Sequence, residues 1–296
     1  MELGLHRLSA AAPQAAQTFG TDAVPLVEHR AHTVLGELSV HDSQTPGPTG
    51  AAQVLVLWPS ILADHRIYLP QVARWRQRYR VLLIDGPGHG RSGPAPGPFS
   101  MAQCAQAQAQ VLDQLGVRQP VVSIGTSWGG LVGGEFALMY PARTRALVML
   151  NTPVFPSRGG LGDRFVTWGA RWMHGLRMYT DGVARAFFLP STRAQQNPFM
   201  AVFREHLAKA DGHALARSVQ SVLVERADLS SRLGQIAAPT LFVAGENDDM
   251  YPLEDLRRAA ATLPRGRFVA LPTAHISVVD APEQTMKAID DFLVGL

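Results

Sequence analysis

The chain has 296 residues, of which 46% are hydrophobic and 17% charged, and its formal net charge is +3. This length and composition fit one large α/β domain, or two small ones, with a sizeable apolar core. The chain has no run of basic residues and no apolar stretch long enough to cross a bilayer. The sequence therefore excludes a membrane-spanning protein and gives no indication of a nucleic-acid partner.

The single cysteine, Cys104, excludes a disulfide within the chain and is consistent with a reducing compartment. We expect Cys104 to be a small core residue of a helix rather than a nucleophile. Residues 1–24 form a segment rich in alanine and glutamine without the compact apolar stretch of a secretory signal. We predict a poorly ordered N-terminal extension and a cytoplasmic protein; the oligomeric state stays open.

Strand and helix patterns alternate along most of the chain after this segment. Runs at 25–30 and 33–42 predict a strand hairpin, followed by a loop rich in proline and glycine at 43–50. Apolar runs predict further strands at 54–57, 81–85, 121–125, 146–150, 240–245 and 268–271. Helices are predicted at 67–78, 100–116 (with a capping box of Ser100 and Gln103), 128–139, 253–263 and 282–293.

This alternation predicts a mostly parallel sheet with helices on both faces, whose functional sites lie at the carboxyl ends of the strands. From 154 to 232 the strand signal is absent, and apolar residues recur at helical spacing. We therefore predict a helical cap at 154–232, inserted into an α/β core made of residues 25–153 and 233–296.

Ser127 stands in the most informative stretch, Gly125-Thr126-Ser127-Trp128-Gly129, between a β-branched run and a stretch compatible with a helix. Gly-x-Ser-x-Gly at a strand-to-helix turn is the pattern of a nucleophile elbow, which raises the serine hydroxyl above the sheet edge. An ordinary structural turn is the alternative, because this pattern also arises by chance in a glycine-rich chain. The flanking strand and helix favour the elbow.

Two further chemically useful residues follow later strands. Asp248 comes after the strand at 240–245, and His275 comes after the last strand. A serine hydroxyl needs a base within hydrogen-bond reach, and the base needs a carboxylate that fixes its tautomer. We predict Ser127 as nucleophile, His275 as base and Asp248 as its orienting acid, in the chain order expected on such a sheet. A solvated loop histidine is the alternative for His275.

Four segments together resemble the α/β-hydrolase superfamily: 125–130, 85–92, Gly245-x-x-Asp248-x-x-x-Pro252, and His275 with 281–283. The resemblance runs from about Pro25 to the C-terminus, and the loop at 59–64 is similar to that of the 3-oxoadipate enol-lactonase and small carboxylesterase group. It implies a mostly parallel, eight-stranded sheet with helices on both faces and a helical cap. It also implies a serine hydrolase that works through an acyl-enzyme, with no metal and no organic cofactor.

The chain departs from the family where a loop lends one N–H to the oxyanion hole. The family usually has His-Gly there, whereas this chain has Trp58-Pro59-Ser60. Pro59 has no N–H to offer. We therefore predict that the N–H of Ile61, or of Ser60, joins that of Trp128 in holding the oxyanion.

The predicted cap is rich in aromatic residues. Trp168 and Trp172 are one helical turn apart, and we predict that they line an apolar substrate pocket with Phe155 and Trp58. Simple core packing is the alternative for each of them. Such a pocket favours an ester or lactone with a hydrophobic portion. Carbon–carbon bond hydrolysis or acyl transfer by the same residues stays open, as does a ligand receptor that turns over slowly or not at all.

Overall fold

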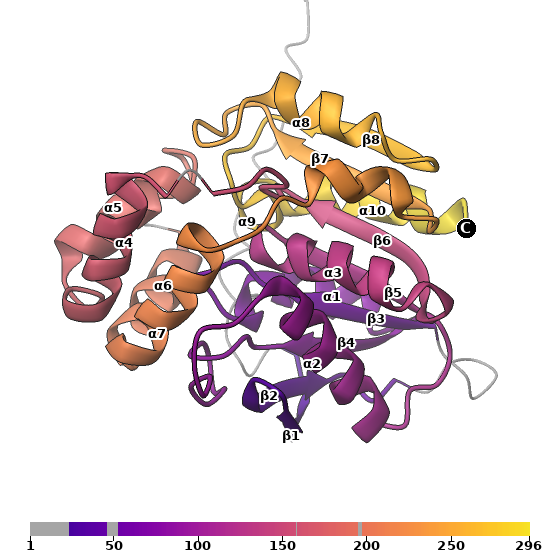
Figure 1. Cartoon of the computed structure of the whole chain (residues 1–296), viewed down its shortest axis with the longest axis horizontal. Coiled ribbons are helices and arrows are strands. Elements are labelled where there is room, and N and C mark those ends of the chain that lie inside the picture. Colours follow the sequence, from indigo (N-terminus) through magenta and orange to yellow (C-terminus); the bar gives the residue numbers. More distant parts are fainter. Residues whose placement is uncertain (1–23, 46–52, 158, 195–196) are drawn as a thin grey trace, which may run out of the picture.

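The computed structural model describes residues 24–45, 53–157, 159–194 and 197–296. Its centre is an eight-stranded sheet in the order β1-β2-β4-β3-β5-β6-β7-β8 (Figure 1). The strands are β1 (Val27–Thr33), β2 (Gly36–Asp42), β3 (Val54–Trp58), β4 (Arg80–Ile84), β5 (Val121–Thr126), β6 (Thr144–Leu150), β7 (Thr240–Gly245) and β8 (Gly266–Leu271). Almost all of the predicted N-terminal extension, 1–24, lies outside the described residues, and so does most of the predicted loop at 43–50.

The sheet is parallel from β4 to β8, and β1 and β2 add an antiparallel hairpin at one edge. Every residue of β3 and β5 is buried, as expected for strands that helices cover on both faces. In β1 only Ala31 is buried, which fits an edge strand. The predicted fold class, a mostly parallel α/β sheet, is confirmed.

Helices cover both faces of this sheet. In the core they are α1 (Leu69–Trp75), α2 (Met101–Gln114), α3 (Trp128–Met139), α8 (Leu253–Ala260), α9 (Ser277–Asp280) and α10 (Pro282–Val294), with short turns η3 (His65–Tyr68), η4 (Pro141–Arg143) and η6 (Ser230–Gln235). α2 packs beside α3 on one face, and α1 packs beside α10 on the other (Figure 1). The predicted capping box of Ser100 and Gln103 starts α2, and burial on that helix raises the pKa of the Cys104 thiol.

Between β6 and β7 the chain forms a separate group of helices. They are α4 (Leu161–Trp172), α5 (Arg177–Phe187), α6 (Pro198–Lys209) and α7 (Gly212–Val219), followed by a π-helical turn, η5 (Gln220–Val224). The group lies beyond the end of the sheet towards which the arrows of β6 and β7 point (Figure 1). Phe188, Phe199 and Phe203 are buried together within it, with ring centroids 5.3–6.3 Å apart. None of the helices that the structure describes is long and apolar enough to cross a membrane.

Candidate active site

Ser127 occupies the sharp turn between β5 and α3. Its backbone has a positive φ of 53°, and its N–H donates to the carbonyl of Leu150 at 2.7 Å. A β-carbon at Gly125 would lie 1.9 Å from the carbonyl carbon of Gly129, and one at Gly129 would lie 1.9 Å from the carbonyl oxygen of Trp58. Both positions therefore require glycine, and the turn holds Ser127 in a conformation that L-residues rarely adopt.

The structure brings Ser127, His275 and Asp248 together at the carboxyl edge of the sheet, and all three are buried. His275 Nε2 lies 2.8 Å from Ser127 Oγ, and its Nδ1 lies 2.7 Å from Asp248 Oδ2. A carboxylate can only accept, so Nδ1 carries the proton in the neutral ring and Nε2 is free to take one from the hydroxyl. The neighbouring Asp249 is exposed.

The loop that carries His275 is held from two sides. The N–H of His275 donates to the carbonyl of Phe187 in α5 at 3.1 Å, and Asn151 Nδ2 donates to the carbonyl of Ala274 at 3.0 Å. Asp280 accepts from the Ala274 N–H at 2.9 Å and also from groups of the cap. Burial raises the pKa of Asp280. Nothing in the sequence indicated Asp280; Asn151 stands directly after β6, a position where a carboxylate could have served as the acid, but its positioning role was not predicted.

The loop after β3 approaches the serine. Trp128 is the first residue of α3, so its N–H has no partner within the helix. Ile61 is buried and lines the same cavity as the serine. The next N–H along, that of Leu62, donates to His89 Nε2 at 3.0 Å and is therefore occupied. Ser60 Oγ is buried without a hydrogen-bond partner among the described residues. The predicted oxyanion donors thus lie on the two segments that border the serine.

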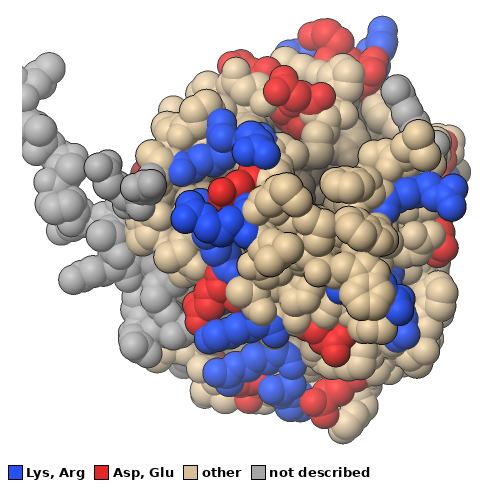
Figure 2. Space-filling view, turned by 90° about the vertical axis from the view of Figure 1, so that its left-hand side faces the viewer, with Lys and Arg blue, Asp and Glu red and all other residues tan. Residues whose placement is uncertain are grey.

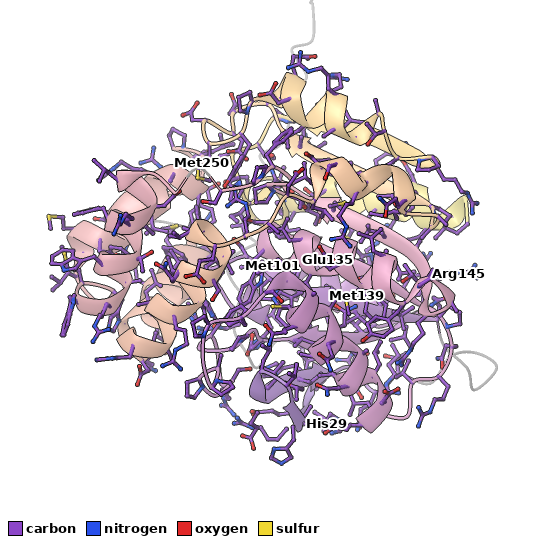
Figure 3. All side chains as sticks on the ribbon, viewed as in Figure 1. His29, Met101, Glu135, Met139, Arg145 and Met250 are labelled. Atoms are coloured by element: carbon purple, nitrogen blue, oxygen red, sulfur yellow. The ribbon has the colours of Figure 1, made fainter. Side chains whose placement is uncertain are left out.

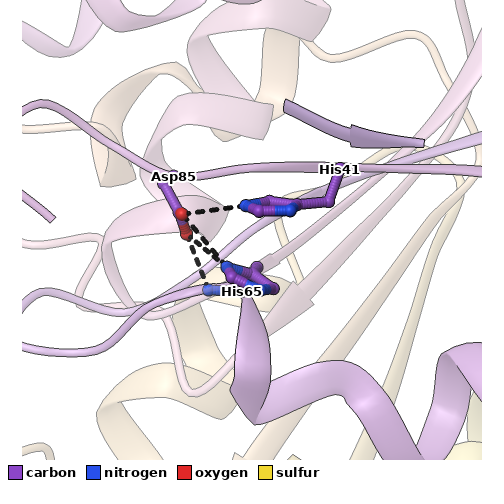
Figure 4. Close-up of side chains that lie close together, drawn as sticks. All are labelled: His41, His65 and Asp85. Carbon is purple, nitrogen blue, oxygen red and sulfur yellow. Dashed lines mark hydrogen bonds and ion pairs between the residues drawn. The ribbon is translucent and has the colours of Figure 1, made fainter. Parts of the chain in front are cut away.

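A buried cluster of His41, His65 and Asp85 lies behind this loop (Figure 4). Asp85 accepts from His41 Nε2 at 3.2 Å, from His65 Nδ1 at 3.0 Å and from the His65 N–H at 2.8 Å. The two rings are stacked with centroids 3.6 Å apart. Burial alone would raise the pKa of Asp85, but the charge of His65 and the hydrogen bonds from both rings lower it. Burial opposes the protonation of His65, yet Asp85 raises the pKa of that ring.

The sequence suggested no metal-ligand cluster, because His41, His65 and Asp85 stand on three separate elements. Within the part of the chain that the structure describes, they form the one group spaced closely enough to hold a metal ion. The carboxylate of Asp85 already accepts hydrogen bonds from the ring nitrogens that face it. These hydrogen bonds account for the arrangement, so no metal is needed to explain it.

A second buried carboxylate connects the same loop to the cap. Asp64 accepts from the guanidinium of Arg66 at 2.6 Å and from His206 Nδ1 in α6 at 3.1 Å. Burial opposes ionisation of Asp64, but the charge and hydrogen bond of His206, with Arg66, hold its pKa well below its usual range. The cap and the loop after β3 are therefore joined by a buried contact between Asp64 and His206.

The cavity beside Ser127 and His275 has a volume of about 290 Å³ and a mostly apolar lining. Its walls come from the loop after β3, from α4 and α5 of the cap, and from the segment after β7 that carries Met250 (Figure 3). The rings of Phe187 and Tyr251 lie 5.4 Å and 5.5 Å from the imidazole of His275. The cavity can therefore hold an apolar group directly beside the hydroxyl.

None of the four residues predicted for the pocket lines this cavity. Trp58 is buried in β3, with its ring 5.5 Å from that of Trp128. Phe155 lies at a separate surface hollow beside η6. Trp168 and Trp172 do share a face of α4, but that face is exposed. These pocket predictions were wrong.

The physical reason for the error on α4 lies on the other side of that helix. Gly169 and Ala170 are its buried residues, and a β-carbon at Gly169 would lie 2.5 Å from the ring of Tyr179. The small residues of α4 thus face inwards, because they let the neighbouring helix approach closely. Helical spacing shows which residues share a face, but not whether that face is turned inwards.

The fold and the buried Ser–His–Asp arrangement define an α/β-hydrolase. Residues 53–282 match the model of the alpha/beta hydrolase fold family. The chain belongs to that family, as its sequence resemblance indicated.

Similar proteins cover most of the chain. The protein "Putative carbamate hydrolase RutD" of Stutzerimonas stutzeri is 29% identical over 254 residues, which are 82% of this chain and 92% of that protein. A pimeloyl-[acyl-carrier protein] methyl ester esterase of Xanthomonas campestris is 28% identical over 83% of this chain and 97% of its own length. The crystal structure of the enol-lactonase of Burkholderia xenovorans is 25% identical, with a TM-score of 0.81 over 90% of this chain and all of that one. The predicted likeness to lactonases and esterases is thus confirmed.

Proposed function

We propose that the protein is a serine hydrolase that cleaves a carboxylic ester or lactone with a hydrophobic portion through an acyl-enzyme on Ser127. Two hydrogen bonds in series through the His275 ring support this most. His275 Nε2 lies 2.8 Å from Ser127 Oγ, and His275 Nδ1 lies 2.7 Å from Asp248 Oδ2. Ser127 and His275 line a mostly apolar cavity of about 290 Å³. Each contact uses a different nitrogen of the ring, as proton transfer from serine requires.

In the proposed reaction, Ser127 Oγ attacks the carbonyl carbon while His275 Nε2 takes the hydroxyl proton. The N–H groups of Trp128 and Ile61 hold the oxygen that becomes negative. His275 then gives its proton to the departing alkoxide, and the acyl group remains on Ser127. Water loses a proton to His275 and attacks the ester, and the acid and the free serine result. With a lactone, the alkoxide stays attached to the acyl chain.

The size and lining of the cavity support an acyl portion of moderate length. The lining is mostly apolar, and the rings of Phe187 and Tyr251 lie close to that of His275. A pocket of this kind gains affinity from apolar groups and has few polar groups to orient them. The three relatives are named for a carbamate, a methyl ester and an enol-lactone, which define the substrate classes to compare.

A fluorophosphonate probe tests the proposal directly. Mass spectrometry of the labelled protein should locate the adduct on Ser127, and the Ser127→Ala variant should remain unlabelled. Hydrolysis should then be measured on esters of increasing acyl length, lactones, carbamates and a vinylogous diketone. Faster turnover of the diketone would indicate carbon–carbon bond hydrolysis, and binding without repeated turnover would indicate a receptor. An adduct on another residue would contradict the mechanism.

A further inference from the structure

The outer face of the cap exposes an unusual amount of apolar surface. Six of the ten large apolar residues that are exposed among the described ones fall between 161 and 178, with 51% to 87% of each accessible. They are Leu161, Phe165, Trp168, Trp172, Leu176 and Met178. The first four recur at helical spacing on one face of α4. We call these six residues the apolar cap face; an apolar patch of this kind commonly marks an interaction site.

Arginines border the apolar cap face. Arg164 and Arg171 are exposed and stand four residues before and three residues after Trp168, so they flank it on α4. Arg185, on α5, lies two turns after Met178. These three arginines have no ion-pair partner among the residues that the structure describes. In the view of this side of the molecule, Lys and Arg groups lie to the left and right of an uncharged region, with Asp and Glu groups among them and below it (Figure 2).

The apolar cap face is continuous with the candidate active site. Phe165 and Met178 belong to this face and also line the cavity that contains Ser127 and His275. Both residues are more than half exposed, so the lining of the cavity extends to the surface at this face. A molecule that leaves an apolar environment at this face would reach the serine without crossing water.

We propose that the apolar cap face and its arginines bind an anionic lipid surface. Helices that lie in a membrane interface typically carry tryptophan, phenylalanine and leucine on one face, with arginine or lysine beside it. Arginines without an ion-pair partner, of which Arg171 lies over the ring of Trp172, favour an anionic surface, because each gains attraction from acidic headgroups. The protein would lie on the membrane without crossing it. The entry of an ester into the cavity from the lipid rests on the proposed function. The binding of the lipid surface itself does not.

Vesicle sedimentation tests the binding. Full-length protein should sediment with phosphatidylglycerol vesicles and much less with phosphatidylcholine vesicles, and added salt should weaken the difference. Intrinsic fluorescence gives a second measurement, since Trp168 and Trp172 are exposed and the other three tryptophans are buried. Emission should shift to shorter wavelength with phosphatidylglycerol vesicles.

Paired variants identify the groups responsible. Arg164→Gln with Arg171→Gln should weaken binding to anionic vesicles about 30-fold, or roughly fivefold for each arginine. Trp168→Ala with Trp172→Ala should weaken it at least tenfold and abolish the fluorescence shift. Met139→Ala and Arg145→Gln are matched controls, because both residues are exposed and lie away from the apolar cap face (Figure 3). These controls should bind like the wild type.

Hydrolysis of a short, water-soluble ester separates this inference from the proposed function. None of the four cap residues changed lines the cavity, so hydrolysis in the absence of vesicles should stay within twofold. Equal binding to neutral and anionic vesicles, or binding to neither, would overturn the inference. So would a wild-type dimer that Trp168→Ala with Trp172→Ala converts to a monomer, because the face would then contact a second copy.

Discussion

Two buried clusters in this protein combine histidine with a carboxylate, and only one of them is arranged for proton transfer. In the first, Nδ1 of His275 faces Asp248 and Nε2 faces Ser127. In the second, a single nitrogen, His41 Nε2, lies 3.2 Å from Asp85 and 3.3 Å from Ser39 Oγ. A nitrogen whose proton is donated to a carboxylate cannot also accept one from a hydroxyl. Residue types alone therefore do not distinguish a catalytic cluster from a structural one.

The position of the second cluster indicates a supporting role. Asp85 accepts from the backbone N–H of His65, the first residue of η3, and from both stacked rings. η3 directly follows the loop that carries the proposed oxyanion donor, Ile61. The first cluster would then perform the chemistry, while the second would hold the loop on which that chemistry depends. The two roles predict different consequences of mutation.

Replacing the proposed nucleophile should have the largest effect. Ser127→Ala should lower kcat by about 10⁶-fold, because the histidine and aspartate have no function without the hydroxyl. The φ of 53° is strained for alanine but not for glycine. Ser127→Gly should therefore be equally inactive, yet its free energy of unfolding should exceed that of Ser127→Ala by about 1 kcal/mol. Ester assays and urea unfolding measure the two quantities; activity of either variant within tenfold of wild type would refute the mechanism.

Asp248→Asn should lower kcat by about 10⁴-fold. The amide can still accept from the Met250 N–H, as Asp248 Oδ1 does at 3.1 Å, so the loop should keep its shape. An amide that donates to Nδ1 would favour the wrong tautomer of His275. Steady-state kinetics with one ester measures the loss. Retention of more than a tenth of wild-type kcat would mean that another group orients the histidine.

Asp85→Asn should lower the stability of the fold more than the activity, in contrast to Asp248→Asn. It removes the charge that faces two buried histidines, so the free energy of unfolding should fall by about 3 kcal/mol. The loss of kcat should stay below about 10²-fold, because only the position of one oxyanion donor is affected. The pKa of Asp85 is lowered by folding, so its stabilisation is present above about pH 4 and disappears as the pH falls through the lowered value.

Asp291→Asn is a matched control for Asp85→Asn. Asp291 pairs with Lys287 on the exposed side of α10. Its loss should change the free energy of unfolding by less than about 1 kcal/mol. Equal losses of stability in the two variants would show that the buried cluster is not a special support.

A smaller effect of pH is expected from His89. Its Nδ1–H donates to the carbonyl of Pro87 at 3.0 Å, and its Nε2 accepts from the Leu62 N–H, which only the neutral ring can do. Burial and the charge of His206 lower its pKa to about 4. As the pH falls below about 6.5, the unfolded chain binds this proton before the folded protein does, and stability declines.

The variant His89→Gln isolates the contribution of His89 to the pH dependence of stability, because an amide can donate and accept hydrogen bonds without titrating. Between pH 7 and pH 5 the wild type should lose on the order of 2 kcal/mol of unfolding free energy that the variant keeps. His65 acts in the opposite direction, since its raised pKa adds stability that is present below about pH 6.5 and lost as the pH rises. That contribution is common to both proteins and cancels in the difference. Parallel pH profiles would contradict the assignment.

The elements that the sequence could predict are those that depend on neighbouring residues. The buried strands follow from short apolar runs, and the turn at Ser127 follows from Gly125 and Gly129, which the backbone itself requires. Each member of the triad follows a parallel strand, and the carboxyl ends of these strands share one edge of the sheet. The sequence could therefore predict that Ser127, Asp248 and His275 lie close together.

The features that could not be predicted depend on packing between distant segments. The outward orientation of Trp168 and Trp172 depends on Gly169, which packs against Tyr179 of the next helix. Asp85 meets His41 and His65 only because β2 and β4 are adjacent and η3 folds back over them. No spacing within the chain indicates either contact.

The smallest expected effect concerns the acid beside Asp248. Adjacent residues of one loop cannot both face the imidazole, and Asp249 is exposed while Asp248 is buried and lies 2.7 Å from Nδ1. Asp249→Asn should therefore lower kcat by less than tenfold and change the free energy of unfolding by less than about 0.5 kcal/mol. The same assays that follow Asp248→Asn measure both quantities. A larger loss of kcat in Asp249→Asn than in Asp248→Asn would mean that the acting carboxylate is one residue further along the loop, and that the contact with Asp248 only supports the turn.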